Sequence, residues 1–222
     1  MTYEIIKDAQ LLRDFIDWLP NLQEGEKFYC CLFARKKYLP SMRSSDKSQL
    51  RRFLSDKKRL FNKIEQLEVK MGAYKIKGEP APPESLVLYI NPNPRSLEKA
   101  SFDSIIQLTE LLKRKNKNFN PQQEVMSTIQ KSVGHKVYLD FDIDDKDFDL
   151  NQLDGVINRS CLRIVQTRGG YHVLVKLDEI DPSFKKTFYQ NMMALGVDQS
   201  GDQLLPVPGC TQGGFMPRFM DF

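Results

Sequence analysis

One segment, KVYLDFDIDD at residues 136–145, constrains the fold of this chain most strongly. Its apolar residues occupy every second position: Val137, Leu139, Phe141 and Ile143. A period of two predicts a β-strand with one buried face, which places Asp140, Asp142 and Asp144 together on the opposite face. Asp is a poor strand former, and carboxylates about 6–7 Å apart on one face repel each other.

Such an acidic face requires a positive partner, and a divalent cation with oxygen ligands is the usual one. An EF-hand loop that starts at Asp140 is excluded, because its sixth position is Asp145 where glycine is required. A solvated edge strand is the structural alternative. The acids that follow are predicted to form a hydrated loop: Asp145, Asp147, Asp149 and Asp154.

A glycine turn comes next in the chain. CLRIVQ and YHVLVKL flank TRGG at residues 167–170, which predicts a β-hairpin. The turn offers a hydroxyl, a guanidinium and open backbone N–H groups, a set that suits a phosphate chain. His172 lies on the second strand of this hairpin. A lone histidine on a strand is more often a packed core residue, so its interpretation as a ligand depends on the acidic strand nearby.

Two later acids are candidates for a third carboxylate of the same site. Asp198 follows Val197, and this pair can begin a strand. Asp202 follows Ser200 and Gly201, which are typical of a loop. Asp198 is therefore the better candidate, and Asp202 is the alternative.

Apolar periodicity and capping residues predict the other elements. Helices are expected at 8–18, 42–70, 98–115, 121–131 and 182–195, and strands at 27–34, 73–78, 86–91, 137–143, 161–166 and 171–177. Because helices and strands mix without strict alternation, the predicted fold class is α+β.

Positive charge is concentrated in residues 35–77, which hold 14 Lys or Arg and 4 Asp or Glu. The expected helix at 42–70 would have a basic outer face, which is typical of polyanion binding or of simple solvation. The candidate nucleic-acid-binding residues are Arg51, Arg52, Lys57, Lys58 and, in the NPNPR turn at 91–95, Arg95. The next candidates are Arg35, Lys36 and Lys37.

Several protein classes are excluded by the remaining composition. No apolar stretch approaches the roughly 18 residues of a membrane span, and the N-terminus has no signal-peptide pattern. A cytoplasmic protein without membrane contact is therefore predicted. The four cysteines form no CxxC or CxxH pair, which argues against zinc and indicates buried free thiols. His135 is interpreted as a structural residue.

Three segments, taken in order, resemble the motifs of the archaeo-eukaryotic primase superfamily, in particular its plasmid and phage primase-polymerases. They are LDFD at 139–142, TRGGYH at 167–172 and VD at 197–198. PGCT at 208–211 resembles a turn that follows the last acid in many members. The resemblance implies one catalytic domain over residues 1–222. It would contain an N-terminal α/β unit at 1–135 that binds template, and a metal- and nucleotide-binding unit at 136–222 with an antiparallel sheet resembling an RNA-recognition (RRM) fold.

The function implied by this resemblance is that of a DNA primase or primase-polymerase, a template-dependent nucleotidyltransferase of DNA replication. Asp140, Asp142 and Asp198 would be catalytic and would hold Mg²⁺ or Mn²⁺, and His172 would contact the triphosphate of the incoming nucleotide. The nucleotide site would also include Thr167, Arg168, Gly169 and Gly170. The implied partners are single-stranded DNA template, nucleoside triphosphates and a separately encoded replication protein such as a helicase.

Two other functions fit the same residues. Carboxylate pairs beside basic patches also serve metal-dependent nucleases, although this function leaves the TRGGYH hairpin without a role. A nucleic-acid-binding protein on a catalytically inactive primase scaffold would retain the acids without turnover.

Overall fold

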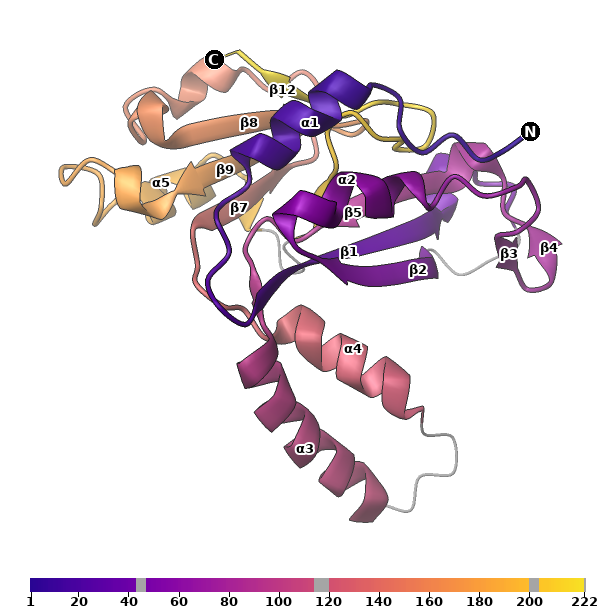
Figure 1. Cartoon of the computed structure of the whole chain (residues 1–222). Coiled ribbons are helices and arrows are strands. Elements are labelled where there is room, and N and C mark those ends of the chain that lie inside the picture. The colour runs from indigo at the N-terminus through magenta and orange to yellow at the C-terminus, as the bar shows by residue number, and fades with distance from the viewer. Residues whose placement is uncertain (43–46, 114–119, 200–203, 222) are drawn as a thin grey trace.

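The computed structural model describes residues 1–42, 47–113, 120–199 and 204–221. Its α-helices are α1 (Ala9–Trp18), α2 (Lys57–Glu65), α3 (Leu97–Lys113), α4 (Pro121–Lys131) and α5 (Phe188–Ala194). These helices combine with antiparallel sheets, which confirms the predicted α+β class. Figure 1 shows α1 and α2 above the first sheet, and the α3–α4 hairpin projecting from the opposite side of the molecule.

The first sheet is formed mainly by the N-terminal half of the chain. Its strands are β1 (Glu26–Arg35), β2 (Lys47–Ser55), β5 (Leu86–Ile90), β6 (Arg95–Ser96) and β11 (Leu205–Pro206). They lie in the order β11-β5-β1-β2, and β6 pairs with the start of β1. Because β11 comes from the end of the chain, the C-terminal segment crosses back from the second sheet to complete the first.

The second sheet contains the acidic strand. Its strands are β7 (Tyr138–Ile143), β8 (Leu162–Gln166), β9 (Tyr171–Lys176), β10 (Asp198–Gln199) and β12 (Arg218–Met220), in the order β10-β7-β9-β8-β12. The helix α5 connects β9 to β10, whereas 3₁₀ turns at Leu150–Leu153 and Arg159–Cys161 lie between β7 and β8. A short separate hairpin pairs β3 (Lys75–Ile76) with β4 (Glu79–Pro80).

Both faces of β7 are packed. The apolar face, with Phe141 fully buried, contributes to a cluster under α5. On the other face of this sheet, Val165 and Leu174 pack into the main core together with Leu32 and Leu88 of the first sheet. The acidic face is therefore packed at one end, where Asp140 is buried, and is open at the other, where Asp142 is partly exposed and Asp144 and Asp198 are exposed.

The NPNPR turn fastens the two sheets together. Asn93 is fully buried, and its Nδ2 donates to the carbonyl oxygen of Tyr138 at 2.8 Å. Its Oδ1 accepts hydrogen bonds from the backbone N–H groups of Val137 and Tyr138, both at 2.8 Å. One side chain at the end of β5 thus satisfies three backbone groups at the start of β7, and it fixes the acidic strand relative to the first sheet.

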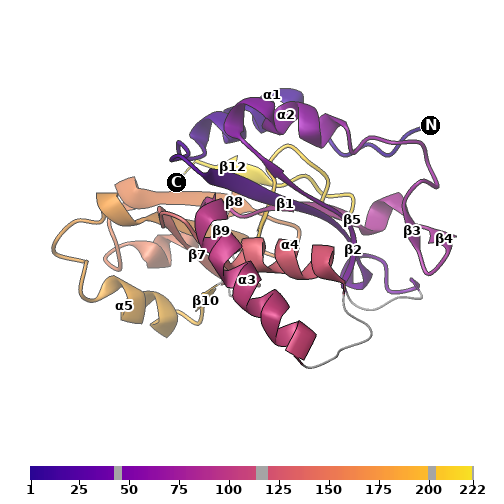
Figure 2. The ribbon, with the colours of Figure 1, turned by 60° about the horizontal axis from the view of Figure 1, so that its bottom comes forward.

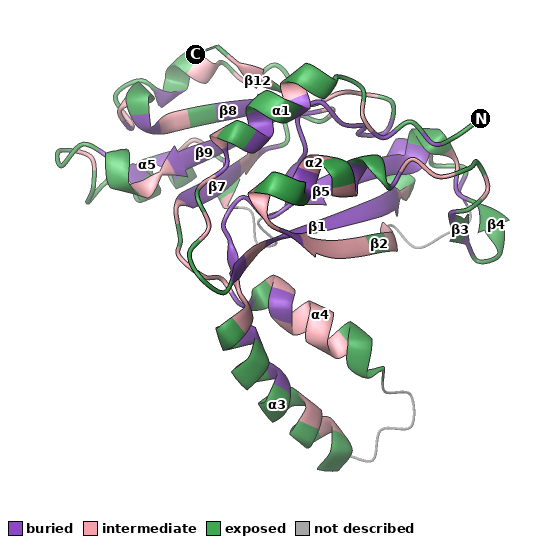
Figure 3. Cartoon of the chain, in the orientation of Figure 1, coloured by how far each residue is buried: buried purple, intermediate pink, exposed green. Residues whose placement is uncertain are grey.

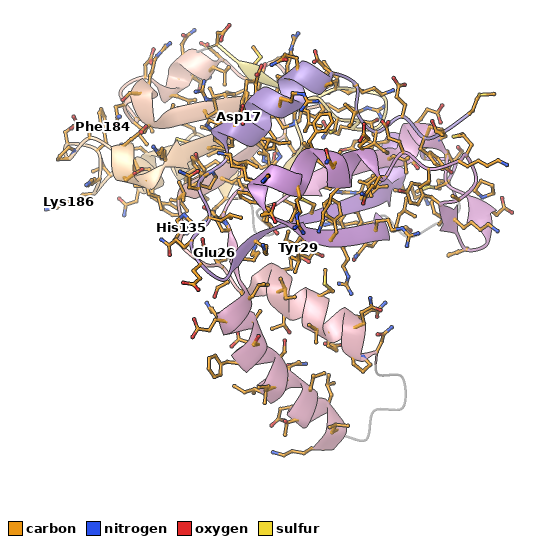
Figure 4. The ribbon with its side chains drawn as sticks, viewed as in Figure 1. Asp17, Glu26, Tyr29, His135, Phe184 and Lys186 are labelled. Atoms are coloured by element: carbon orange, nitrogen blue, oxygen red, sulfur yellow. The ribbon has the colours of Figure 1, made fainter. Side chains whose placement is uncertain are left out.

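A second set of contacts lies at the base of the α3–α4 hairpin, where this hairpin joins the first sheet. The Glu26 carboxylate accepts hydrogen bonds from the backbone N–H groups of Gln23 and His135, both at 2.8 Å, and lies 2.7 Å from His135 Nδ1. Figure 4 shows Glu26 and His135 together at this junction. The interpretation of His135 as a structural residue agrees with this contact. Burial alone would raise the pKa of Glu26, but these hydrogen bonds and His135 lower it below its ordinary value.

The predicted long helix at 42–70 is wrong. Residues 47–55 form β2, which pairs with β1 from Phe28↔Ser55 to Arg35↔Lys47, and the helix α2 begins only after the N-cap Asp56. Side chains such as Leu50 and Phe53 have helical spacing in the sequence but pack in the sheet, because tertiary pairing overrides local periodicity. The helix expected from 182 also begins later, at Phe188.

The helix α3 carries several large apolar side chains that are exposed. Figure 3 shows α3 mostly exposed, and its large exposed apolar side chains are Phe102, Ile105, Ile106 and Leu112.

The four cysteines are buried free thiols, as predicted. Among the described residues, no helix has both the length and the hydrophobicity to cross a membrane.

Candidate active site

The register of the second sheet brings the predicted site residues onto one face. Asp142 of β7 lies directly opposite His172 of β9 on one side and directly opposite Asp198 of β10 on the other. Asp140 is two residues earlier on β7 and shares this face. Asp202 lies outside the described residues. The carboxylates at 140, 142 and 198 and the imidazole at 172 are therefore neighbours across three strands.

His172 lies between two of the carboxylates. Its Nδ1 is 2.9 Å from Asp140 Oδ1, and its Nε2 is 3.7 Å from Asp142 Oδ1. Only 6 % of His172 and 2 % of Asp140 are exposed. Burial by itself would lower the pKa of His172, but Asp140, followed by Asp142 and Asp144, raises it above the ordinary value. The two carboxylates thus favour the protonated form of His172, which would offset part of the acidic charge.

The carboxylates have the chemistry of a hard-cation site but are not assembled as one. Asp140 Oδ2 is buried and has no hydrogen-bond partner among the described residues. Burial, together with Asp144 and Asp140, raises the pKa of Asp142, although His172 acts in the opposite direction. Both features indicate unbalanced negative charge. No group of three His, Cys, Asp or Glu side chains in the described part of the chain is arranged to hold a metal ion.

A cleft of about 480 Å³ lies over this acidic face. Its acidic wall is formed by the second sheet and carries Asp142, Asp144 and Asp198. Its basic wall is formed by the first sheet. This wall carries Arg35 at the end of β1, Lys37 in the turn that follows β1, and Lys47 at the start of β2. The two walls carry opposite charge, and His172 also lines the space between them.

The basic wall is produced by strand pairing. Arg35 and Lys47 are cross-strand partners in β1 and β2, so their side chains emerge on the same face of the first sheet. Arg35 Nη1 donates to Tyr89 Oη at 3.0 Å, and Lys47 Nζ lies 4.8 Å from the centre of the Phe33 ring. Aromatic side chains thus hold both cations at the cleft.

The TRGG turn contributes only part of its predicted set to the cleft. Thr167 and Gly169 line it. Gly170 instead packs against the end of β7, where an added Cβ would collide with the carbonyl oxygen of Ile143. The Thr167 N–H donates to the carbonyl oxygen of Gly170 at 2.8 Å, which closes the turn.

The prediction that Arg168 contacts the nucleotide in the cleft does not agree with its position. Arg168 is absent from the described lining of the cleft. Its backbone N–H donates to Gln212 Oε1 at 2.8 Å, its Nη1 donates to the carbonyl oxygen of Gly213, and its guanidinium lies 5.0 Å from the centre of the Tyr38 ring. These contacts hold the side chain on the other side of the turn.

The predicted nucleic-acid-binding residues do not form one surface. Arg51 and Arg52 are adjacent on a strand, so their side chains point to opposite faces. Arg52 reaches α4, where Nη2 donates to the Gln123 carbonyl oxygen at 3.2 Å. Lys57 Nζ donates to the carbonyl oxygens of Asp17 and Leu19, at 2.8 and 2.6 Å, so it fastens α2 to the end of α1.

Lys58 and Arg95, the last two of these residues, differ in exposure to solvent. Lys58 is exposed on α2, above the first sheet and on the opposite side from the projecting hairpin (Figure 2). Arg95 is only 2 % exposed, and burial lowers its pKa to about 10. Arg95 is therefore a core residue and not a surface contact for template.

Sequence reasoning missed several residues of the cleft. Asp144 was placed on the acidic face by the alternation of the strand but was not assigned a role in the site. Arg35 and Lys37 were among the second candidates for nucleic-acid binding. Lys47, Tyr89 and Gln212 carried no local signal, because only the pairing of distant segments brings them here.

No model of a known protein family, no curated protein and no solved structure matches the chain.

Proposed function

We propose that this protein is a metal-dependent, template-directed nucleotidyltransferase of the primase-polymerase type. The observation that carries the proposal is the cleft with carboxylates on one wall and cations on the other. Such a site can take a nucleoside triphosphate, because the phosphates need cationic contacts and the attacking hydroxyl needs acidic groups that hold metal. The motif resemblance and the antiparallel order of the second sheet support the same function.

Residues of the basic wall would bind the triphosphate. Arg35 can form paired hydrogen bonds to phosphate oxygens, and Lys37 and Lys47 add point charges. Thr167 and the backbone at Gly169 line the cleft from the turn between β8 and β9 of the second sheet. The proposed role of His172 changes with its geometry: its contact with Asp140 makes it a positioning residue that sets the acidic face, in addition to lining the cleft.

Asp142 and Asp198 are the residues that would hold Mg²⁺ or Mn²⁺, with Asp144 at the same wall. Their oxygen donors match the preference of these cations. Asp140 would act through His172 or through its unpartnered Oδ2. When bound, the metal would activate a 3′-hydroxyl and neutralise the leaving pyrophosphate. The chain itself positions the reactants, which is the larger part of catalysis in phosphoryl transfer.

The decisive experiment is nucleotide incorporation on a single-stranded DNA template with labelled nucleotides and Mn²⁺, with and without a primer. The wild-type protein should extend or initiate a strand, and Asp142→Ala should abolish incorporation while the circular dichroism spectrum is unchanged. Asp147→Ala, in the exposed loop after β7, is the matched control and should retain activity. Full activity of Asp142→Ala would contradict the assignment.

A second function is favoured by one observation. His172 lies between Asp140 and Asp142, and no described group of three ligands is preassembled for a metal. A nucleic-acid-binding protein without turnover would have this arrangement. It would bind template equally well with EDTA and with Mn²⁺, and it would incorporate no nucleotide with or without a primer.

A further inference from the structure

A second cavity lies on the other side of the TRGG turn. Its volume is about 460 Å³, close to that of the cleft, and Thr167 is the one lining residue that the two have in common among the described residues. It lies between the turn at 167–170 and a second glycine turn at 213–215. The cavity is therefore a separate compartment that touches the cleft through the side of one turn.

The lining of this cavity is cationic. Arg168 and Lys146 contribute side chains, and none of the described residues that line it is acidic. The flanking residues Asp145 and Asp147 lie next to Lys146 in the chain, and Asp145 Oδ1 accepts the Asp147 N–H at 2.9 Å. The acids near the cavity thus belong to the loop outside it.

Arg168 is held in place at this cavity before any ligand binds. Its backbone is fixed by Gln212, its guanidinium donates to the Gly213 carbonyl oxygen, and it lies over the Tyr38 ring. A guanidinium has five N–H donors, and the bond to Gly213 uses one of them. A positioned guanidinium loses less entropy on binding an anion than a mobile one.

The opposite wall supplies an open approach and an apolar contact. Gly214 is exposed, has a φ of +82°, and an added Cβ there would meet no atom within 4 Å. Phe215 follows Gly214 on this wall, whereas Tyr171 lines the cavity from the start of β9, where its Oη donates to the Lys146 carbonyl oxygen at 3.0 Å. Cations next to aromatic surface form a binding mode suited to a phosphate that carries a sugar and a base.

From these features we infer that the cavity is a second phosphate-binding site, distinct from the cleft, for the phosphate of single-stranded nucleic acid or of a free nucleotide. The inference rests on the proposed function only for the class of ligand. Arg168 has the main role through its fixed guanidinium, and Lys146 adds an exposed charge. The site also accounts for the position of Arg168, which the cleft does not use.

Binding measured in EDTA tests the site without any contribution from metal held in the cleft. The probes are fluorescently labelled oligo(dT), followed by anisotropy, and ATP, followed by calorimetry. Arg168→Gln should weaken one of them about tenfold or more, as expected for a lost hydrogen bond to a charged group. Lys146→Gln should weaken the same probe about threefold. Lys186→Gln, on the protruding loop before α5 (Figure 4), is the matched control and should change neither.

The two probes distinguish the sources of the phosphate. Loss of oligo(dT) binding alone assigns the site to single-stranded nucleic acid. The slope of log binding constant against log salt concentration should then be lower by about 0.7 for each phosphate contact removed. Loss of ATP binding alone assigns it to a free nucleotide. Unchanged binding of both probes to both variants would overturn the inference. Lys146→Gln keeps the test valid if Arg168→Gln disturbs the turn, because Lys146 is exposed. Nucleotide incorporation is not measured, so failure of the catalytic proposal would leave this result unaffected.

Discussion

Replacing Asp142 by Asn removes one of two carboxylates that face each other across β7 and β10, and it should stabilise the metal-free protein. Like charges directly opposite on a sheet destabilise it by about 0.2–1 kcal/mol. The Asp142 side chain is 39 % exposed, so solvent screens part of the repulsion and a gain of about 0.5 kcal/mol is expected. For a chain of this length that corresponds to a rise in Tm of about 1–2 °C.

The same substitution should have the opposite effect once a divalent cation is added. A ligand present at about 100 times its Kd stabilises the folded state by about 2.7 kcal/mol, which raises Tm by about 5–11 °C. The wild-type protein should show such a rise with Mn²⁺, and Asp142→Asn should show little or none. Thermal denaturation followed by circular dichroism, with EDTA and with Mn²⁺, measures both effects in one series.

The control is Asp147→Asn, which removes one charge from the exposed loop after β7. It should leave both melting temperatures close to those of the wild type. The reasoning would be refuted if Asp142→Asn lowered Tm in EDTA by several degrees, because the carboxylate would then be a structural acceptor. An equal Mn²⁺ response in wild type and variant would refute the metal assignment.

Three further predictions follow from the contacts described above. Lys37→Gln and Lys47→Gln should each raise the KM for nucleotide several-fold, whereas Lys58→Gln on α2 should not, as steady-state kinetics would show; equal effects of all three would contradict the placement of the triphosphate. Asn93→Ala leaves three backbone groups unsatisfied, two on Tyr138 and one on Val137 just before β7, and should cost about 3 kcal/mol or more, measured by urea denaturation. An unchanged midpoint would show that Asn93 does not hold the start of β7 in place. Because the pKa of Glu26 is lowered in the folded state, the stability that Glu26 contributes is complete above its unfolded pKa of about 4.5 and is lost as pH falls through the lower folded value. Glu26→Gln should therefore be less stable than wild type at neutral pH and should lose less stability on acidification, and parallel pH profiles would contradict this.

The acidic wall of the cleft could be predicted from the sequence because its signal is local. Alternation over a few residues fixes which side chains of β7 share a face, and this holds for Asp140, Asp142 and Asp144 wherever the strand lies. His172 and Asp198 required in addition that β9 and β10 pair with β7 in the observed register.

The basic wall could not be predicted in this way. Arg35 and Lys47 meet because β1 pairs with β2, and the apolar residues of β2 have a spacing that also fits a helix. Arg95 shows a second limit of local reading: an arginine in a proline turn is usually exposed, but here β6 pairs with β1 and buries it. Burial and cross-strand neighbours are properties of the assembled sheet.

The hairpin of α3 and α4 leaves the body and returns to it at almost the same place. Ser96 N–H donates to the Ser132 carbonyl oxygen at 2.9 Å, Gly134 N–H donates to the Pro94 carbonyl oxygen at 2.9 Å, and Arg95 and Val133 form a bridge. A segment closed by its own base can change in length without altering the path of the strands on either side. Insertions or deletions in the α3–α4 hairpin should therefore be tolerated, because they leave the two sheets and the cleft between them unchanged.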